Sequence, residues 1–324
     1  MLAVVSVAAA QAPVVGEIDF YGLHRVTAEN ILNALHVKPG DPLPPSKGSL
    51  EDTIEKIPGV AMGRVAAVCC EGPRASLLIG IEETGAAHPE FHPEPTGTAT
   101  LPEELRDSYR QFVTAVERAA RRGDTSEDFT AGHPMMTDAE ARAYPPRFIS
   151  FASSHLDQLR DVLRNSAEAD QRAIAAAVID YAPNKKEIVE DLEYAAQDPE
   201  ETVRANAIRS LTEIGVLANG QSNLGIKVSP AWFIELLNSI VLSDRVESAK
   251  ALLTLTDRAD PAVLGQIRER GLPALAEMAR WKMPRYALPP FLLLGRVAGL
   301  TDAQVHQSWE KGDRETVIGK ALKK

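Results

Sequence analysis

Histidines and carboxylates gather in one Pro-rich segment of the sequence, HPEFHPEP, at His88, Glu90, His92 and Glu94. Imidazole and carboxylate groups bind divalent metals, so this segment is a candidate metal or catalytic site. Pro89 and Pro93 nevertheless prevent a helix that would place both histidines on one face. The spacing also matches none of the common zinc patterns, and we therefore expect no metal and no cofactor here.

Two further histidines lie beside residues that could take part in chemistry. His155 follows Ser153 and Ser154. Adjacent residues of a helix do not face each other, so we expect no serine–histidine pair and place His155 on an apolar helix face. His133 lies in the segment GHPMM, whose methionines could form a soft binding patch but more commonly fill irregular gaps in a core.

The sequence contains no P-loop, no G-x-G-x-x-G fingerprint, no H-E-x-x-H and no G-x-S-x-G. We therefore predict no catalytic residues and a protein that is not an enzyme. The alternative is an enzyme or metal-binding protein with a site near the Pro-rich segment, which would use His88, His92, His133 or Glu90.

One short run combines cations with aromatic rings, at Arg280, Trp281, Lys282, Arg285 and Tyr286. Aromatic and arginine side chains are enriched where proteins meet their partners, so this run is a candidate partner-binding site. It could equally be a kinked loop between helices that packs Trp281 inward.

Composition places the chain among soluble globular proteins with two or three structural units. Of its 324 residues 44% are hydrophobic, 25% charged and 5% aromatic, and Ala and Leu dominate the apolar set, which favours helices. The formal net charge is −10, so we expect no nucleic-acid partner. The two cysteines, Cys69 and Cys70, are adjacent, which excludes a disulfide framework and predicts buried thiols.

Residues 1–12 have the pattern of a signal peptide. An apolar run, Leu2–Ala10, precedes Ala10-Gln11-Ala12, which is an A-x-A cleavage site. A basic n-region is missing, so the signal could begin further upstream. No later run is long and apolar enough to cross a membrane. We expect an exported, periplasmic or extracellular protein without an integral membrane segment.

Residues 13–83 read as a small α/β domain with the order β-α-α-β-β. Apolar residues alternate over 14–21, 60–70 and 75–83, and two short helices lie between the first two strands, the first capped by Thr27. The segments EIDFYGLHRVTAENILNAL, VKPGDPL, IPGVAMGRV and SLLIGIEE resemble the POTRA domains of bacterial envelope proteins. The resemblance implies a module that binds partners by adding a strand to a sheet edge.

Residues 84–102 contain four prolines and two glycines and read as a linker. Residues 103–146 read as a long helix, which ends near Gly123, followed by an irregular connector. From residue 147 to 324 the pattern is helix after helix. Asn184 and Asp198 are predicted to open helices with capping boxes, and Thr301 is predicted to do the same with Gln304.

The helices of 147–324 carry a loose repeat. Ala175, Ala207 and Ala249 occupy equivalent places, 32 and 42 residues apart, as expected for an α-solenoid. The line DPEETVRANAIRSL resembles a HEAT repeat, and the resemblance implies that Asp198 and Arg204 help to stack successive repeats. The predicted fold class is thus mainly α, a HEAT-like α-solenoid preceded by a POTRA-like α/β domain.

Two binding folds without catalytic motifs predict a non-catalytic protein-binding scaffold or adaptor of the bacterial cell envelope. It would bind a protein partner with the solenoid surface and, through an edge strand, with the small domain. An outer-membrane protein assembly factor is a further alternative. The sequence leaves the partner and the oligomeric state open.

Overall fold

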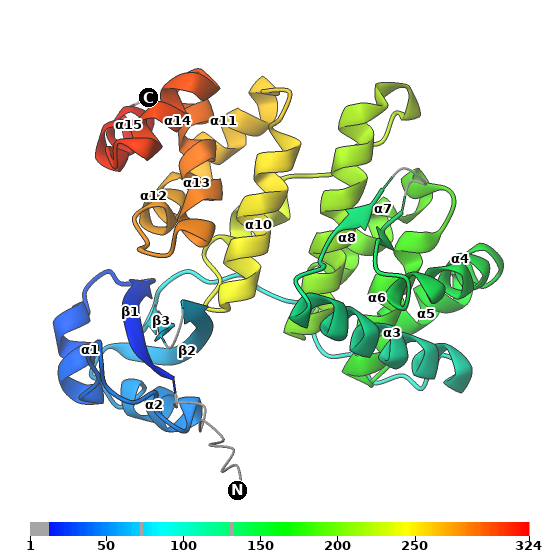
Figure 1. Cartoon of the computed structure of the whole chain (residues 1–324), viewed down its shortest axis with the longest axis horizontal. Coiled ribbons are helices and arrows are strands. Elements are labelled where there is room, and N and C mark those ends of the chain that lie inside the picture. The colour runs from blue at the N-terminus through cyan, green and yellow to red at the C-terminus, as the bar shows by residue number, and fades with distance from the viewer. Residues whose placement is uncertain (1–12, 72–73, 130–132, 324) are drawn as a thin grey trace, which may run out of the picture.

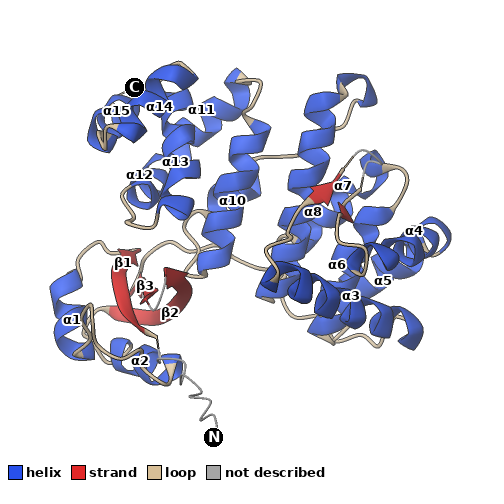
Figure 2. Cartoon of the chain, in the orientation of Figure 1, coloured by secondary structure: helices blue, strands red, loops and turns tan. Residues whose placement is uncertain are grey.

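The computed structural model describes residues 13–71, 74–129 and 133–323, so the predicted signal peptide at 1–12 lies outside the described residues. The strands, α-helices and 3-10 helices (η) are β1 (Val14–Tyr21), α1 (Ala28–Leu35), α2 (Lys47–Ile54), β2 (Val60–Glu71), β3 (Arg74–Glu83), α3 (Glu103–Arg121), β4 (Glu127–Asp128), β5 (Met135–Met136), η1 (Ala141–Ala143), α4 (Pro145–Ser154), α5 (Leu156–Asn165), α6 (Ala169–Val178), η2 (Ile179–Tyr181), α7 (Lys185–Ala195), α8 (Glu201–Gly220), η3 (Ser222–Leu224), α9 (Ala231–Leu236), α10 (Leu242–Leu255), α11 (Pro261–Arg270), α12 (Leu272–Ala279), α13 (Pro284–Val297), α14 (Asp302–Glu310) and α15 (Arg314–Leu322). The molecule is mainly helical, with a small sheet at its N-terminal end (Figure 2).

The first three strands form a sheet in the order β1-β3-β2, in which β1 runs parallel and β2 antiparallel to β3. Alternation along β3 sends Leu77, Ile79 and Ile81 to one face, where they pack with Ile31 of α1 and Ile54 of α2. We call β1–β3, α1 and α2 the small module. The element order β-α-α-β-β and the strand positions are those that the apolar alternation predicts.

The opposite face of the sheet packs against the helices instead of facing water. Leu78 of β3 and Tyr21 of β1 are buried in the same core as the helical body. Figure 1 shows the small module, in blue and cyan, beside the orange helices α12 and α13. Both faces of the sheet are therefore covered, one by its own helices and one by the C-terminal half of the chain.

Glu83, the last residue of β3, fixes the turn that leads into α1. Its buried carboxylate accepts hydrogen bonds from the main-chain N–H groups of His24, Arg25 and Val26, at 2.7–2.8 Å. Burial alone would raise the pKa of Glu83, but these donors and the Arg25 side chain outweigh it and lower the pKa to about 2.

Cys69 differs from the sequence prediction. Its side chain is exposed and disulfide-bonded, so the prediction of a buried free thiol is wrong for this residue. The physical reason is its place near the end of β2, where the strand register shifts between Val68 and Glu71. The Cys70 side chain lies outside the part that the structure describes.

Antiparallel helix pairs stack from α5 to α15 as a helical repeat solenoid. Helices α6, α8, α10, α13 and α15 contact one another in succession and form one side of the stack, and α5, α7, α9, α12 and α14 precede them in the pairs. Ala175, Ala207 and Ala249 are all buried between these helices, where their small side chains allow close approach. None of the helices in the described ranges is long and apolar enough to cross a membrane.

Helix starts test the capping predictions residue by residue. Thr27 accepts a hydrogen bond from the Asn30 N–H, and Thr301 forms a capping box with Gln304, so both predictions are confirmed. Asn184 is the N-cap residue of α7, as predicted, but its side chain makes no capping hydrogen bond, so the predicted capping box is wrong. The buried Lys185, the first residue of α7, connects the helix to the preceding segment instead, because its ammonium donates to the Asp180 carbonyl.

Residues 84–102 contain no helix or strand and run extended across the helical body (Figure 1). We call residues 91–101 the strap. Its first residue contacts α8 and α9, and its last residue contacts the start of α6. The strap therefore runs from later helices toward earlier ones, in the direction opposite to the order of the helices in the sequence. It is therefore packed on the helices along its length rather than being a free tether.

Candidate functional site

Buried arginine–aspartate pairs connect successive layers of the helical stack. Arg172 of α6 binds both carboxylate oxygens of Asp198, at 2.7 and 2.9 Å, and both side chains are almost fully buried. One layer further on, Arg204 of α8 binds Asp244 of α10, with its Nε and Nη2 donating at 3.0 and 2.8 Å. Two-point pairs of this kind fix the angle between planar groups, and thus between the layers.

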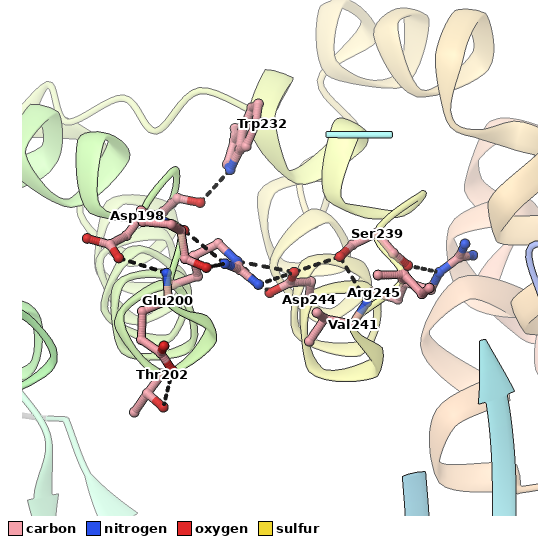
Figure 3. Close-up of polar contacts among 12 residues, drawn as sticks. Asp198, Glu200, Thr202, Trp232, Ser239, Val241, Asp244 and Arg245 are labelled. Atoms are coloured by element: carbon pink, nitrogen blue, oxygen red, sulfur yellow. Dashed lines mark hydrogen bonds and ion pairs between the residues drawn. The ribbon is translucent and has the colours of Figure 1, made fainter. Parts of the chain in front are cut away.

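The same pairs also hold the turns that precede the helices. Arg204 donates to the main-chain carbonyls of Asp198 and Pro199, and Asp244 accepts from the Ser239 hydroxyl at 2.7 Å. Figure 3 shows the hydrogen bonds around Asp198, Ser239, Asp244 and Arg245. Asp198 and Arg204, singled out from the sequence, thus each pair with a neighbouring layer and touch each other only through the Asp198 carbonyl.

The partners of Asp198 explain why the helix begins later than predicted. Its carboxylate is bound by Arg172 and by the Glu200 N–H, and α8 starts at Glu201 without a side-chain cap. The predicted capping box at Asp198 is therefore wrong, because a buried cation, and not the first turn of the helix, takes most of the acceptor capacity of this carboxylate.

The run of cations and aromatics at 280–286 lies between the helical body and the small module. The Trp281 indole N–H donates to the Phe20 carbonyl at 3.3 Å, and its ring packs 5.7 Å from the Tyr21 ring. The Lys282 ammonium donates to the Ile18 carbonyl at 2.9 Å. Arg285 reaches the Cys69 carbonyl at 3.4 Å, so the run contacts both outer strands of the sheet.

Arg280 and Tyr286, the other two residues of that run, make different contacts. Arg280 forms a two-point pair with the exposed Glu315, both hydrogen bonds being 2.8 Å long. The Tyr286 ring lies 4.9 Å from the guanidinium of Arg285. Sequence alone could not assign Glu315 to Arg280, since the two residues are 35 positions apart in the chain.

Tyr21 lies at the centre of the contact between the two parts of the chain. Its hydroxyl donates to the Ile240 carbonyl at 2.9 Å, and the Arg245 guanidinium lies over its ring. Glu277 binds both Arg245 and the Gly22 N–H, at 3.0 and 2.9 Å. We call the buried pairs Arg172–Asp198 and Arg204–Asp244 the ladder. Arg245 follows Asp244 and donates to the Ser239 carbonyl in the turn before α10, so the small module is fixed to the stack by a buried arginine beside the ladder.

Both outer strands of the sheet have backbone groups that are occupied by side chains. On β1, Lys282 binds the Ile18 carbonyl. On β2, the carboxylates of Glu51 and Glu55 accept from the N–H groups of Val65 and Gly63, at 2.8 and 3.3 Å. Side chains that cover an edge in this way oppose strand addition, so an incoming strand would first have to displace them.

The histidines singled out as possible metal ligands lie in three separate places. His88 lies 3.4 Å from Glu82 at the end of β3, and His92 stacks on Tyr194 of α7 at 4.3 Å. His133 lies near Tyr181, 5.6 Å between ring centres. Among the described residues no group of three or more His, Cys, Asp or Glu side chains is placed to hold a metal ion.

Ser154 and His155 contradict the expectation that they do not face each other. Ser154 Oγ lies 3.0 Å from His155 Nδ1, and both side chains are exposed. The reason is a break in the helix: α4 ends at Ser154, and His155 has φ −133° and ψ 34° before α5 begins. The prediction that His155 lies on an apolar helix face is therefore wrong. The Ser154 hydroxyl also donates to the Ser150 carbonyl at 2.7 Å.

A cavity of about 410 Å³ opens beside the C-terminal half of α8. Its walls include Phe129 and His133 from the connector and Leu217 from α8, and its polar lining comes from Asp180 of η2 and Glu213 of α8. Asp180 is 2% exposed, and its Oδ2 has no hydrogen-bond partner. A buried acid pair beside an apolar cavity is an arrangement often found at binding sites.

Burial and the neighbouring Asp180 carboxylate raise the pKa of Glu213 to about 8, although Arg209 opposes this shift. Burial and Lys185 lower the pKa of His133, so this imidazole is neutral at pH 7. The sequence analysis missed Asp180 and Glu213. The available signal was an acid inside an apolar helical run, in VIDYA and LTEIG.

No protein-family model matches this chain, and no curated protein matches it. Solved structures similar to it include the designed armadillo repeat protein YIII(Dq)4CqI, with 14% identity, 68% of this chain and 98% of that chain covered, and a TM-score of 0.36. A second match is to computationally designed armadillo repeat proteins for modular peptide recognition, with 13% identity, 68% of this chain and 98% of that chain covered, and a TM-score of 0.37. A third is the designed armadillo repeat protein YIII(Dq.V1)4CPAF in complex with peptide (KR)4, with 13% identity, 68% of this chain and 99% of that chain covered, and a TM-score of 0.36.

Proposed function

We propose that this chain is a non-catalytic protein-binding scaffold or adaptor. The observation that carries the proposal is the strap, an extended segment held along the ends of successive helical layers. Phe91 lies under the Arg204 guanidinium at 4.1 Å and against the Trp232 ring. The His92 N–H donates to the Gln197 carbonyl at 2.9 Å.

Further along, the strap continues to bind through its main chain. The Gly97 carbonyl accepts from the Ala167 N–H at 2.9 Å, and the Leu101 N–H donates to the Gln171 side chain. Ring stacking and main-chain hydrogen bonds are also the contacts by which proteins recognise extended peptides. The helical stack therefore has the surface chemistry for an extended partner, and it already applies this chemistry to its own chain.

A second surface is available for a partner where α3 crosses the stack. A hollow of about 670 Å³ lies between α3, α6 and the start of α8. Tyr109 and Ile174 line it, and Val113 at its edge is 39% exposed. Exposed apolar residues beside a hollow are typical of protein contact sites, and we place the partner here.

We propose further that Trp281, Lys282 and Arg285 of the run at 280–286 bind a partner within the chain, the small module. Export to the periplasm or the cell exterior, with an envelope role, is also a proposal, and the run Leu2–Ala10 with its A-x-A site supports it. The POTRA-like and HEAT-like resemblances of the sequence agree with this assignment.

Site-specific photo-crosslinking in the source cells tests the scaffold proposal. A photoreactive residue at Val113 should give one discrete protein adduct, whereas the same group at Asp157 of α5, whose side chain is 99% exposed, should not. Equal adduct patterns from both positions, or none from Val113, would contradict a partner at this hollow.

A further inference from the structure

The cavity beside α8 combines an apolar wall with a polar floor. Phe129 and Val216 are 40% and 52% exposed, which is unusual for large apolar side chains, and both line this cavity together with Leu217. At the other end of the cavity lies the acid pair Asp180 and Glu213. The shape and chemistry suit an elongated apolar stem that ends in a hydrogen-bond donor.

The floor lacks a donor rather than an acceptor. Asp180 Oδ1 lies 3.4 Å from the Lys185 ammonium, while Oδ2 receives no hydrogen bond. Glu213 receives one from Arg209 at 3.0 Å and lies within hydrogen-bonding reach of Asp180. Two carboxyl groups within hydrogen-bonding reach of each other repel when both are charged, so the pair favours either a shared proton or a cation between them.

The balance of charge around the pair points the same way. Lys185 from α7 faces Asp180 of η2, and Arg209 from α8 binds both Glu213 and Glu127 of β4, while the neutral His133 lines the same cavity. With Glu213 protonated, two acids face two bases. With Glu213 ionised, one negative charge is in excess, and one bound monovalent cation would neutralise it.

We propose that this cavity binds a primary alkylammonium group, with its nitrogen between Asp180 and Glu213 and its stem along Phe129, Val216 and Leu217. A primary ammonium has three compact donors and can take the place of the proton that the Asp180 and Glu213 carboxyl groups share. A quaternary ammonium has no N–H for these oxygens. A guanidinium has five N–H groups, more than this floor has free acceptors to satisfy, and unsatisfied buried donors are costly.

The ammonium group could come from a free amine or from a lysine side chain of a protein. Both sources share the same head and a similar stem, so both fit the cavity. The proposal stands independently of the scaffold function, because a free amine could bind without any protein partner and the scaffold could bind its partner at another surface.

Titration calorimetry with n-hexylamine on the full chain tests the proposal, with n-hexanol and hexyltrimethylammonium as probes that lack the charge or the donors. Hexylamine should bind, and each comparison probe should bind about tenfold or more weakly. Binding should release a proton from Glu213, so its affinity should rise between about pH 6.5 and about pH 8.5. The proton release is measured by repeating the titration in buffers of different ionisation enthalpy.

Three variants locate the site. Glu213→Gln should weaken hexylamine about tenfold or more and abolish the proton release. Val216→Lys changes only an exposed rim residue, so it should fold normally and weaken hexylamine by repulsion at the entrance. Asp157→Asn removes a fully exposed acid elsewhere and should change nothing.

A short Leu-Lys-Leu peptide and its acetyl-lysine form separate the two sources. Tighter binding of the lysine peptide than of hexylamine identifies a protein side chain as the source, and weaker binding identifies a free amine. No binding of hexylamine, or binding that neither Glu213→Gln nor Val216→Lys weakens, would overturn the proposal. Either of these failures would leave the crosslinking result at Val113 unaffected.

Discussion

Removing one arginine from the buried ladder should cost far more stability than removing an exposed arginine of the same geometry. Arg204 and Arg280 each make a two-point pair, with Asp244 and Glu315 respectively, and the hydrogen bonds are 2.8–3.0 Å long. The first pair is almost fully buried, whereas the arginine and glutamate of the second are 47% and 67% exposed. Burial is therefore the main difference between them.

Arg204→Met leaves the Asp244 carboxylate buried with the Ser239 hydroxyl as its remaining side-chain partner, and it leaves the Asp198 and Pro199 carbonyls without their donor. Breaking a buried pair from one side costs about 3–5 kcal/mol of unfolding free energy. Arg280→Met removes a solvent-screened pair and should cost about 0–1 kcal/mol.

Urea unfolding followed by circular dichroism at neutral pH measures both values. Because an apolar replacement of the whole pair removes the stranded charge, the double variant Arg204→Met, Asp244→Leu should recover at least part of the loss. If Arg204→Met and Arg280→Met cost the same within about 1 kcal/mol, the ladder does not hold the layers together and the reasoning fails.

Trp281→Ala should destabilise the protein by about 3–5 kcal/mol, seen in urea unfolding, and should make the small module sensitive to protease; unchanged digestion would show that its docking does not depend on this ring. The pKa of Glu83 is lowered on folding, so its contribution to stability is present above about pH 4.5 and is lost as the pH falls toward 2; acid titration of the unfolding free energy should show this loss in the native chain and not in Glu83→Gln. The pKa of Glu213 is raised on folding to about 8, so the native chain should lose stability relative to Glu213→Gln as the pH rises from about 4.5 to about 8. Melting temperatures of both proteins across this range would show the loss, and a difference between them that does not change with pH would contradict the shift. Phe91→Ala should cost about 1–2 kcal/mol and expose residues 84–102 to protease, whereas Glu90→Ala, at an exposed position, should do neither.

Local periodicity in the sequence predicts much of this fold. Alternation over 14–21, 60–70 and 75–83 predicts the three strands because it reports directly which side chains face the core. The small residues Ala175, Ala207 and Ala249 indicate the repeat because helices that stack closely need small side chains where they meet. Caps that depend only on neighbouring residues, such as Thr301 with Gln304, are likewise predictable.

The features that sequence reasoning missed depend on pairs distant in the chain or on a single torsion angle. Glu213 meets Asp180 only because α7 returns the chain between them, and Arg204 finds Asp244 across the next layer. Ser154 faces His155 because the helix breaks at one residue, which no periodicity reports. Asp198 has the residues of a helix cap, but tertiary structure assigns its carboxylate to Arg172.

The contact between the small module and α12–α13 sets an order in time for the synthesis of this protein. Tyr21 and Ile18 find their partners 219 and 264 residues further along the chain. At a translation rate of about 5–20 residues per second, that delay is on the order of 10–50 seconds. During this interval Leu78 and its neighbours form an uncovered apolar sheet face on the nascent chain. We therefore expect the ribosome-bound intermediate, rather than the finished protein, to be the species that most needs a chaperone.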